Sequence, residues 1–105
     1  FAGGRGTYPA TKQISFVTIA STGNAVEFGN LSIGRWMAGQ GASSNTRGIF
    51  MSGIAGDGPS YSDFTNAIDF ITIASTGNAQ DFGDVTNKSY SGGGCSDSHG
   101  GLGGY

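Results

Sequence analysis

One segment of eight residues occurs twice in this chain, and the duplication constrains the fold more than any other feature. Residues 18–25 read TIASTGNA, and residues 72–79, which lie 54 positions later, read the same. The similarity continues outward, since the segments ISFV and FGNL around the first copy correspond to IDFI and FGDV around the second. We therefore interpret the 105 residues as a single segment made of two repeats, residues 1–49 and residues 50–105.

Each repeat has the residue pattern of short β-strands. The apolar stretches are dense in β-branched and aromatic residues without strict alternation, which favours strands covered on both faces. The Ser-Thr-Gly-Asn segment after each first strand is typical of a turn, so each repeat is expected to begin with a hairpin. No helical periodicity is found, and the predicted class is all-β. The expected strands are residues 14–20, 25–28, 35–42 and 47–52 in the first repeat, and residues 68–74, 79–82, 89–95 and a stretch near 100–104 in the second.

Composition and charge exclude several classes of protein. The 21 Gly occur with only 2 Pro and without a period of three, which excludes collagen. Disorder is the alternative for so glycine-rich a chain, but the apolar residues recur at matched places. Only 5 basic residues face 7 acidic ones and no basic run exists, so no nucleic-acid partner is expected. Cys95 is the single cysteine and excludes an internal disulfide.

The apolar stretches are too short for a membrane span. The chain begins at Phe1 without Met, and we therefore expect it to be a processed product or a piece of a longer chain.

Four short antiparallel strands in about fifty residues are typical of one blade of a β-propeller. Residues 1–4 resemble residues 50–53 and residues 102–104, so the chain starts and stops at about the same point of the repeat. Two blades cannot close a ring, because propellers need about four to eight. We therefore expect the ring to be completed by self-association, most simply three chains giving about six blades, or by a longer parent chain. A β-solenoid is the alternative, although its coils are usually shorter.

The residues that carry the propeller interpretation resemble a kelch-type repeat, in which a strand running into Gly-Gly precedes an aromatic residue and then an Arg. The corresponding residues here are Gly3, Gly4, Phe16, Phe28 and Arg35, with Phe70 and Phe82 in the second copy. The chain departs from that pattern where Phe28 and Phe82 replace the usual Trp, and where Ser89 replaces the Arg. The TIASTGNA segment is also similar to repeats in structural and tail-associated proteins of marine bacteriophages. This resemblance implies a virion or extracellular source and surface or receptor binding.

Four aromatic residues are the candidate ligand-binding residues, namely Trp36, Tyr61, Tyr8 and Tyr90. Aromatic rings stack on sugar faces and contribute strongly to binding at interfaces. Trp36 falls where the copies differ, since Tyr90 takes the corresponding place, although the same rings could instead pack between blades. The loop at residues 57–65 is about five residues longer than its counterpart after Gly4, and such an insertion is where recognition is expected.

The polar residues do not form a convincing metal or catalytic site. The carboxylates lack the spacing of a calcium loop and are better explained by solubility and turn hydrogen bonds. His99 lies near Cys95 and Asp97, but one Cys and one His cannot supply a metal site or an oriented nucleophile. Arg35 and Arg47 are interpreted as donors to free carbonyl groups of neighbouring loops. The carboxylates considered are Asp57, Asp63, Asp69, Asp81 and Asp84.

These observations predict a non-enzymatic structural or interaction protein, without cofactor or metal. It is expected to be a virion tail or surface scaffold that assembles with copies of itself or with other virion proteins. The alternative is a carbohydrate- or receptor-binding module that presents its aromatic residues on propeller loops to a host surface glycan.

Overall fold

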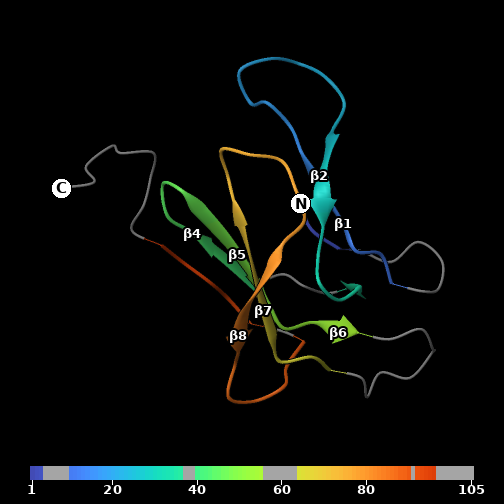
Figure 1. Ribbon diagram of the computed structural model, residues 1–105, viewed down its shortest axis with the longest axis vertical. Helices are drawn as coiled ribbons and strands as arrows, with labels where there is room; N and C mark the ends of the chain where they lie inside the picture. The colour runs from blue at the N-terminus through green and yellow to red at the C-terminus, as the bar shows by residue number, and fades with distance from the viewer. Residues whose placement is uncertain (4–9, 37–39, 56–63, 91, 97–105) are drawn as a thin grey trace.

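The computed structural model describes residues 1–3, 10–36, 40–55, 64–90 and 92–96, and it confirms the all-β prediction for them. These residues form eight strands and no helix, so the described part contains no helix that could cross a membrane (Figure 1). The expected strand near residues 100–104 lies outside the described residues.

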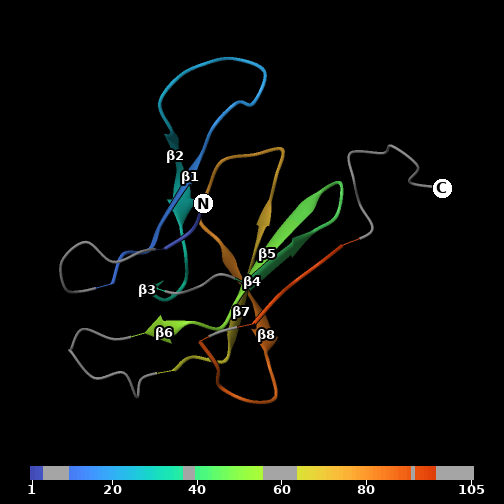
Figure 2. The ribbon, with the colours of Figure 1, turned by 180° about the vertical axis from the view of Figure 1, so that it is seen from behind.

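The largest sheet has four strands in the order β4-β5-β7-β8, each antiparallel to the next (Figure 2). The strands are β4 (Gln40–Ser43), β5 (Arg47–Met51), β7 (Ala67–Thr72) and β8 (Gln80–Asp84). Except for the short β6, the chain visits them in their spatial order, which makes the sheet a meander. The expected boundary between the repeats falls inside β5, so this sheet joins the end of the first repeat to the start of the second.

A separate hairpin, β1 (Gln13–Phe16) and β2 (Val26–Asn30), repeats the geometry of β7 and β8 at the 54-residue offset. Ile14 lies opposite Gly29 in the first hairpin, and Ile68 lies opposite Gly83 in the second. Both ladders shift register immediately after the isoleucine, where a β-bulge adds one residue to the second strand. The bulge has the same place in both copies, so the sequence repeat is also a repeat of backbone structure.

The aromatic residues of the hairpins repeat as well. The ring centroids of Phe16 and Phe28 are 6.0 Å apart at an interplanar angle of 90°, and those of Phe70 and Phe82 are 6.0 Å apart at 79°. Edge-to-face pairs of this kind stabilise each hairpin by about 0.5–1.5 kcal/mol beyond the area they bury.

The strand before each hairpin also recurs, but at a different offset. The backbone N–H of Gly3 donates to the Gln13 carbonyl at 3.0 Å, and that of Ser52 donates to the Ala67 carbonyl at 3.0 Å. Gly3 has φ of 71° and Ser52 has φ of 60°, so both turn through the left-handed region. Gly3 and Ser52 are 49 positions apart whereas the hairpins are 54 apart, which places five additional residues in the second connection.

Two expected strands are shorter than predicted. Strand β1 ends at Phe16 and β7 ends at Thr72, because the first residues of each TIASTGNA copy already turn. The Ser21 N–H donates to the Thr18 carbonyl at 3.3 Å, and the Ser75 N–H donates to the Thr72 carbonyl at 3.3 Å. Local i to i+3 hydrogen bonds therefore replace the continuation of the ladder.

The strand expected at residues 35–42 is divided. Strand β3 (Arg35–Trp36) pairs with the short β6 (Ile54–Ala55), whereas β4 pairs with β5. The weaker strand expected at 89–95 does not form among its described residues. Instead Gly94 lies against the backbone of Gly41 in β4, where an added Cβ would come within 2.2 Å of the Gly41 carbonyl oxygen.

The hydrophobic core is small and lies where the first hairpin meets the four-stranded sheet. Ile14, Phe28 and Leu31 are buried and form its centre. The half-buried residues that pack against them come from both repeats, and they are Ala2, Phe50, Ile71 and Ala79. The buried apolar side chains of the described residues are therefore concentrated at the junction of the two repeats.

Candidate functional site

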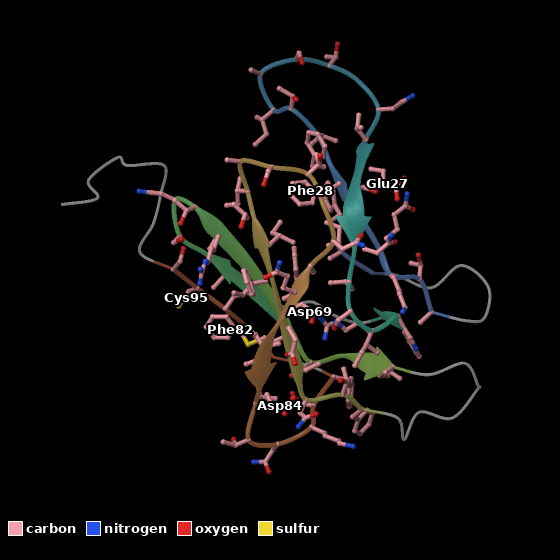
Figure 3. The ribbon with its side chains drawn as sticks, viewed as in Figure 1. Glu27, Phe28, Asp69, Phe82, Asp84 and Cys95 are labelled. Atoms are coloured by element: carbon pink, nitrogen blue, oxygen red, sulfur yellow. The ribbon has the colours of Figure 1, made fainter. Side chains whose placement is uncertain are left out.

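A buried ion pair joins the two repeats at this junction. Nη2 of Arg35, on β3, lies 2.8 Å from Oδ2 of Asp69, on β7, and neither side chain is exposed to solvent. Asp69 lies near the centre of the molecule (Figure 3). Since a buried charge must be paired and hydrogen-bonded to be tolerated, Arg35 and Asp69 depend on each other.

Neighbouring groups also bond to both carboxylate oxygens of Asp69 and to both Nη atoms of Arg35. Asp69 accepts hydrogen bonds from the backbone N–H of Ser32 at 3.0 Å and from its hydroxyl at 2.5 Å. Arg35 donates to the Ala67 carbonyl at 3.0 Å and to the Phe50 carbonyl at 3.4 Å. The guanidinium therefore fixes both central strands of the sheet, β5 and β7, to β3. The sequence predicted that Arg35 donates to backbone carbonyl groups, but these belong to strands rather than to loops, and the ion pair with Asp69 was not predicted.

Burial lowers the pKa of the Arg35 guanidinium, and the negative charge of Asp69 acts in the opposite direction. An arginine side chain keeps its proton in proteins even when such a shift occurs. The group therefore acts as a fixed positive charge that cross-links strands. Its Nε and the hydroxyl of Ser52 have no hydrogen-bond partner in the structure.

The second contact between the repeats is made by the TIASTGNA copy at residues 72–79, whose last residues, 77–79, lie along the outer edge of β2. The Gly77 N–H donates to the Phe28 carbonyl at 2.8 Å, and the Ala79 N–H donates to the Asn30 carbonyl at 2.8 Å. In return, the Asn30 N–H donates to Oδ1 of Asn78 at 3.1 Å. The loop thus occupies the outer edge of the first hairpin through main-chain and side-chain hydrogen bonds, without forming a strand of its own, and this contact resembles β-augmentation.

Glycine is required where this loop meets β2. A Cβ added to Gly29 would come within 2.0 Å of the carbonyl oxygen of Gly77, which is far inside any real contact. Phe28, beside the docked loop, is 9% exposed, whereas its counterpart Phe82 is 57% exposed. Figure 3 shows Phe28 between β2 and the docked loop, and Phe82 on β8 away from it. The lower exposure of Phe28 reflects its place in the core, where Phe50 and Ile71 of the sheet pack together with Ala79 of the docked loop.

A hollow of about 420 Å³ lies beside the docked loop. It is lined by Phe28, Phe70, Thr72 and residues 75–80, none of which titrates near neutral pH. Among the described residues, no group of three His, Cys, Asp or Glu side chains could hold a metal ion.

Two of the four predicted aromatic residues are described. Trp36 is half-buried on β3, opposite Ile54 of β6. Tyr90 is 43% exposed, and its ring centroid lies 4.9 Å from that of Phe64. Tyr8 and Tyr61 lie outside the described residues, so a ligand surface formed by these aromatics stays a prediction.

The other polar candidates have separate places. The Arg47 guanidinium lies 4.8 Å from the centroid of the Phe70 ring, in a cation–π contact, rather than on a loop carbonyl. Asp81, at the bulge of β8, accepts a hydrogen bond from the Gly83 N–H at 3.0 Å, Asp84 is exposed at the end of β8, and Cys95 is exposed. Asp57, Asp63, Asp97, His99 and most of the 57–65 loop lie outside the described residues.

Asp69 is the residue whose role sequence reasoning missed, because it was grouped with carboxylates that serve solubility and turns. The sequence nevertheless contains an indication. Asp69 interrupts an apolar strand where the first repeat has Ser15, and Arg35 stands where the second repeat has Ser89. At each of these two positions one copy has serine and the other has a charged residue, and the two charges are opposite. This pattern predicts an ion pair between the repeats.

No protein-family model, no curated protein and no solved structure matches this chain. The kelch and bacteriophage resemblances therefore stay predictions.

Proposed function

We propose that this chain is a non-enzymatic structural protein whose repeat units assemble with copies of itself, as blades of a kelch-like β-propeller. The observation that carries the proposal is the junction of the two repeats. The second repeat supplies a loop and a charged residue to the first repeat. Each repeat therefore has one surface that can join the repeat before it and one that can join the repeat after it.

The four-stranded meander supports the propeller form, since sequential antiparallel strands are the architecture of a blade. The buried charges support a structural role, because Arg35 and Asp69 are closed from solvent and bonded to backbone and side-chain groups of the fold. The resemblance of the TIASTGNA segment to bacteriophage structural proteins supports a virion or extracellular location.

Carbohydrate or receptor binding remains the alternative predicted from the sequence. The described residues favour assembly over it, because Tyr90 packs against Phe64 and Trp36 belongs to a strand pair, while the contacts between the repeats suggest a mode of assembly.

The native mass of the purified chain tests the proposal. Light scattering behind size exclusion, over a hundredfold range of concentration, is expected to show a mass that rises to a defined multiple, most simply three chains for a ring of about six blades. Far-ultraviolet circular dichroism establishes that the protein is folded. A folded β-protein that stays monomeric over the whole range would contradict the proposal.

A further inference from the structure

The two TIASTGNA copies have the same sequence but different surroundings. Residues 77–79 of the second copy bond to β2, whereas the first copy, within the described residues, makes only its own turn hydrogen bond. Residues 16–27 are exposed at every position, and residues 72–78 of the docked copy are exposed as well, so the two copies differ in their partners rather than in overall exposure. Both views show that this first loop extends away from the rest of the chain (Figures 1 and 2). Ile19 is 96% exposed while its counterpart Ile73 is 46% exposed, and nothing lies within 4 Å of a Cβ added at Gly23. The first copy therefore has the sequence that docks on β2 in the second copy, but it has no strand edge to bind within the described chain.

Strand β8 has the opposite property, because it offers a strand edge to which no segment of the described chain is bound. It is the last strand in the order of its sheet, so one of its edges has no strand partner among the described residues. Its register and bulge match those of β2, which means that the same backbone groups face outward on both strands. On β2 that edge receives the second loop, whereas at Gly83 nothing lies within 4 Å of an added Cβ. Phe82, which is 57% exposed, is the apolar residue left uncovered.

We propose that residues 18–25 of one molecule dock on the outer edge of β8 in a second copy of this chain, and repeat there the contact seen inside the molecule. The equivalent bonds run from the Gly23 N–H to the Phe82 carbonyl, from the Ala25 N–H to the Asp84 carbonyl, and from the Asp84 N–H to Oδ1 of Asn24. This inference rests on the proposed self-assembly and names the two surfaces that perform it.

The sequence of the acceptor edge agrees with this arrangement. All three bonds use backbone atoms of β8, so the replacement of Asn30 by Asp84 leaves them unchanged. The Phe and Gly positions are retained as Phe82 and Gly83. Unpaired strand edges bind extended segments readily, because every main-chain group gains a partner.

The donor loop also begins in the same shape as its docked copy, since both contain the same turn hydrogen bond of 3.3 Å. The docked Gly77 has φ of 157°, whereas Gly23 is not among the positive-φ glycines. Glycine adopts the conformation of the docked copy without steric cost, and the first copy has a glycine at the equivalent position.

The joint between two molecules lacks the ion pair of the joint inside one. The positions of Arg35 and Asp69 are taken by Ser89 of one copy and Ser15 of the next. Two hydroxyl groups carry no charge to desolvate, so the joint between molecules does not depend on a buried ion pair as the joint inside one molecule does. Because the loop and the edge are different surfaces, the contact is head-to-tail and generates a ring or an open filament.

Complementation between two blocked variants tests the interface. Ala25→Pro removes a donor from the loop, and Asp84→Pro removes the outward N–H from β8, at positions where proline is tolerated in an edge. Each variant alone is expected to be monomeric, since each lacks one of the two surfaces. Their equimolar mixture is expected to form a dimer and nothing larger, because it contains one intact loop and one intact edge.

The outcomes distinguish a wrong choice of interface from a failure of the proposed self-assembly. If the wild-type chain assembles but the blocked variants assemble equally well, or if their mixture stays monomeric, the interface is wrong while self-assembly stands. If the folded wild-type chain is itself monomeric, both proposals fail.

A matched pair of substitutions gives a test that does not depend on proline. Asn24→Ala is expected to weaken association by about five- to tenfold, the value of one hydrogen bond, without lowering the melting temperature. Asn78→Ala removes the same side chain from the docked copy and is expected to lower the melting temperature without weakening association. Equal effects of the two substitutions on association would overturn the proposal.

Discussion

Replacing Asp69 by Asn leaves the buried guanidinium of Arg35 without a counter-ion, in a place where neither side chain is exposed. Asparagine has nearly the same volume and keeps an acceptor for Ser32, so the main change is the loss of negative charge. Removing one partner of a buried pair costs about 3–5 kcal/mol, since the other charge stays desolvated. A domain of this size has about 5–15 kcal/mol of stability, so the variant is expected to lose a large part of it.

The assay is urea unfolding followed by the fluorescence of Trp36, which is the only tryptophan in the chain and directly follows Arg35. With a urea dependence of about 1–3 kcal/mol per M, the midpoint is expected to fall by about 2 M. The measurement is made at concentrations where the chain is monomeric, because assembly would add to the apparent stability.

The double variant Arg35→Met with Asp69→Asn separates an orphaned charge from a general packing defect. Methionine removes the charge and retains an apolar side chain, so the double variant is expected to be more stable than Asp69→Asn alone. The reasoning is refuted if Asp69→Asn lies within about 1 kcal/mol of the wild type, or if the double variant is no more stable than the single one.

Two further stability predictions follow from the docked loop. Gly29→Ala is expected to destabilise the chain by about 2–4 kcal/mol or to release the loop, because its Cβ would meet a backbone carbonyl at 2.0 Å. Gly23→Ala is the control and is expected to leave the melting temperature unchanged. Similar melting temperatures of the two variants would contradict this prediction. Phe28→Ala is expected to cost about 3–5 kcal/mol in denaturant unfolding, and Phe82→Ala much less in the monomer, since the two rings are 9% and 57% exposed. Equal losses would show that Phe28 is not buried in solution as it is in the structure.

Local β-structure was accessible from the sequence because it depends on residue type and spacing. The identical segments predicted equivalent hairpins, and the ladders of β1–β2 and β7–β8 have the same register and bulge. The boundaries were less accurate, since the turn begins at Thr18 rather than at Ser21. The reason is that a threonine can extend a strand or open a turn, and neighbouring strands decide between them.

The candidate site was only partly accessible. The structural role of Arg35 was predicted, but its partner Asp69, which lies 34 residues away, was not. The division of residues 35–42 between β3 and β4 was also missed, because their pairing with β6 and β5 depends on contacts distant in sequence.

The sequence by itself determined that this chain is an all-β duplication, since strand propensity, turn chemistry and the 54-residue identity are all local properties. Only the tertiary structure decided that one TIASTGNA copy is bonded to a neighbouring strand and the other is not. Identical sequences have identical local preferences, so the difference between them comes entirely from their neighbours. Residues 72–79 have β2 beside them, and residues 18–25 have no such edge within the described chain.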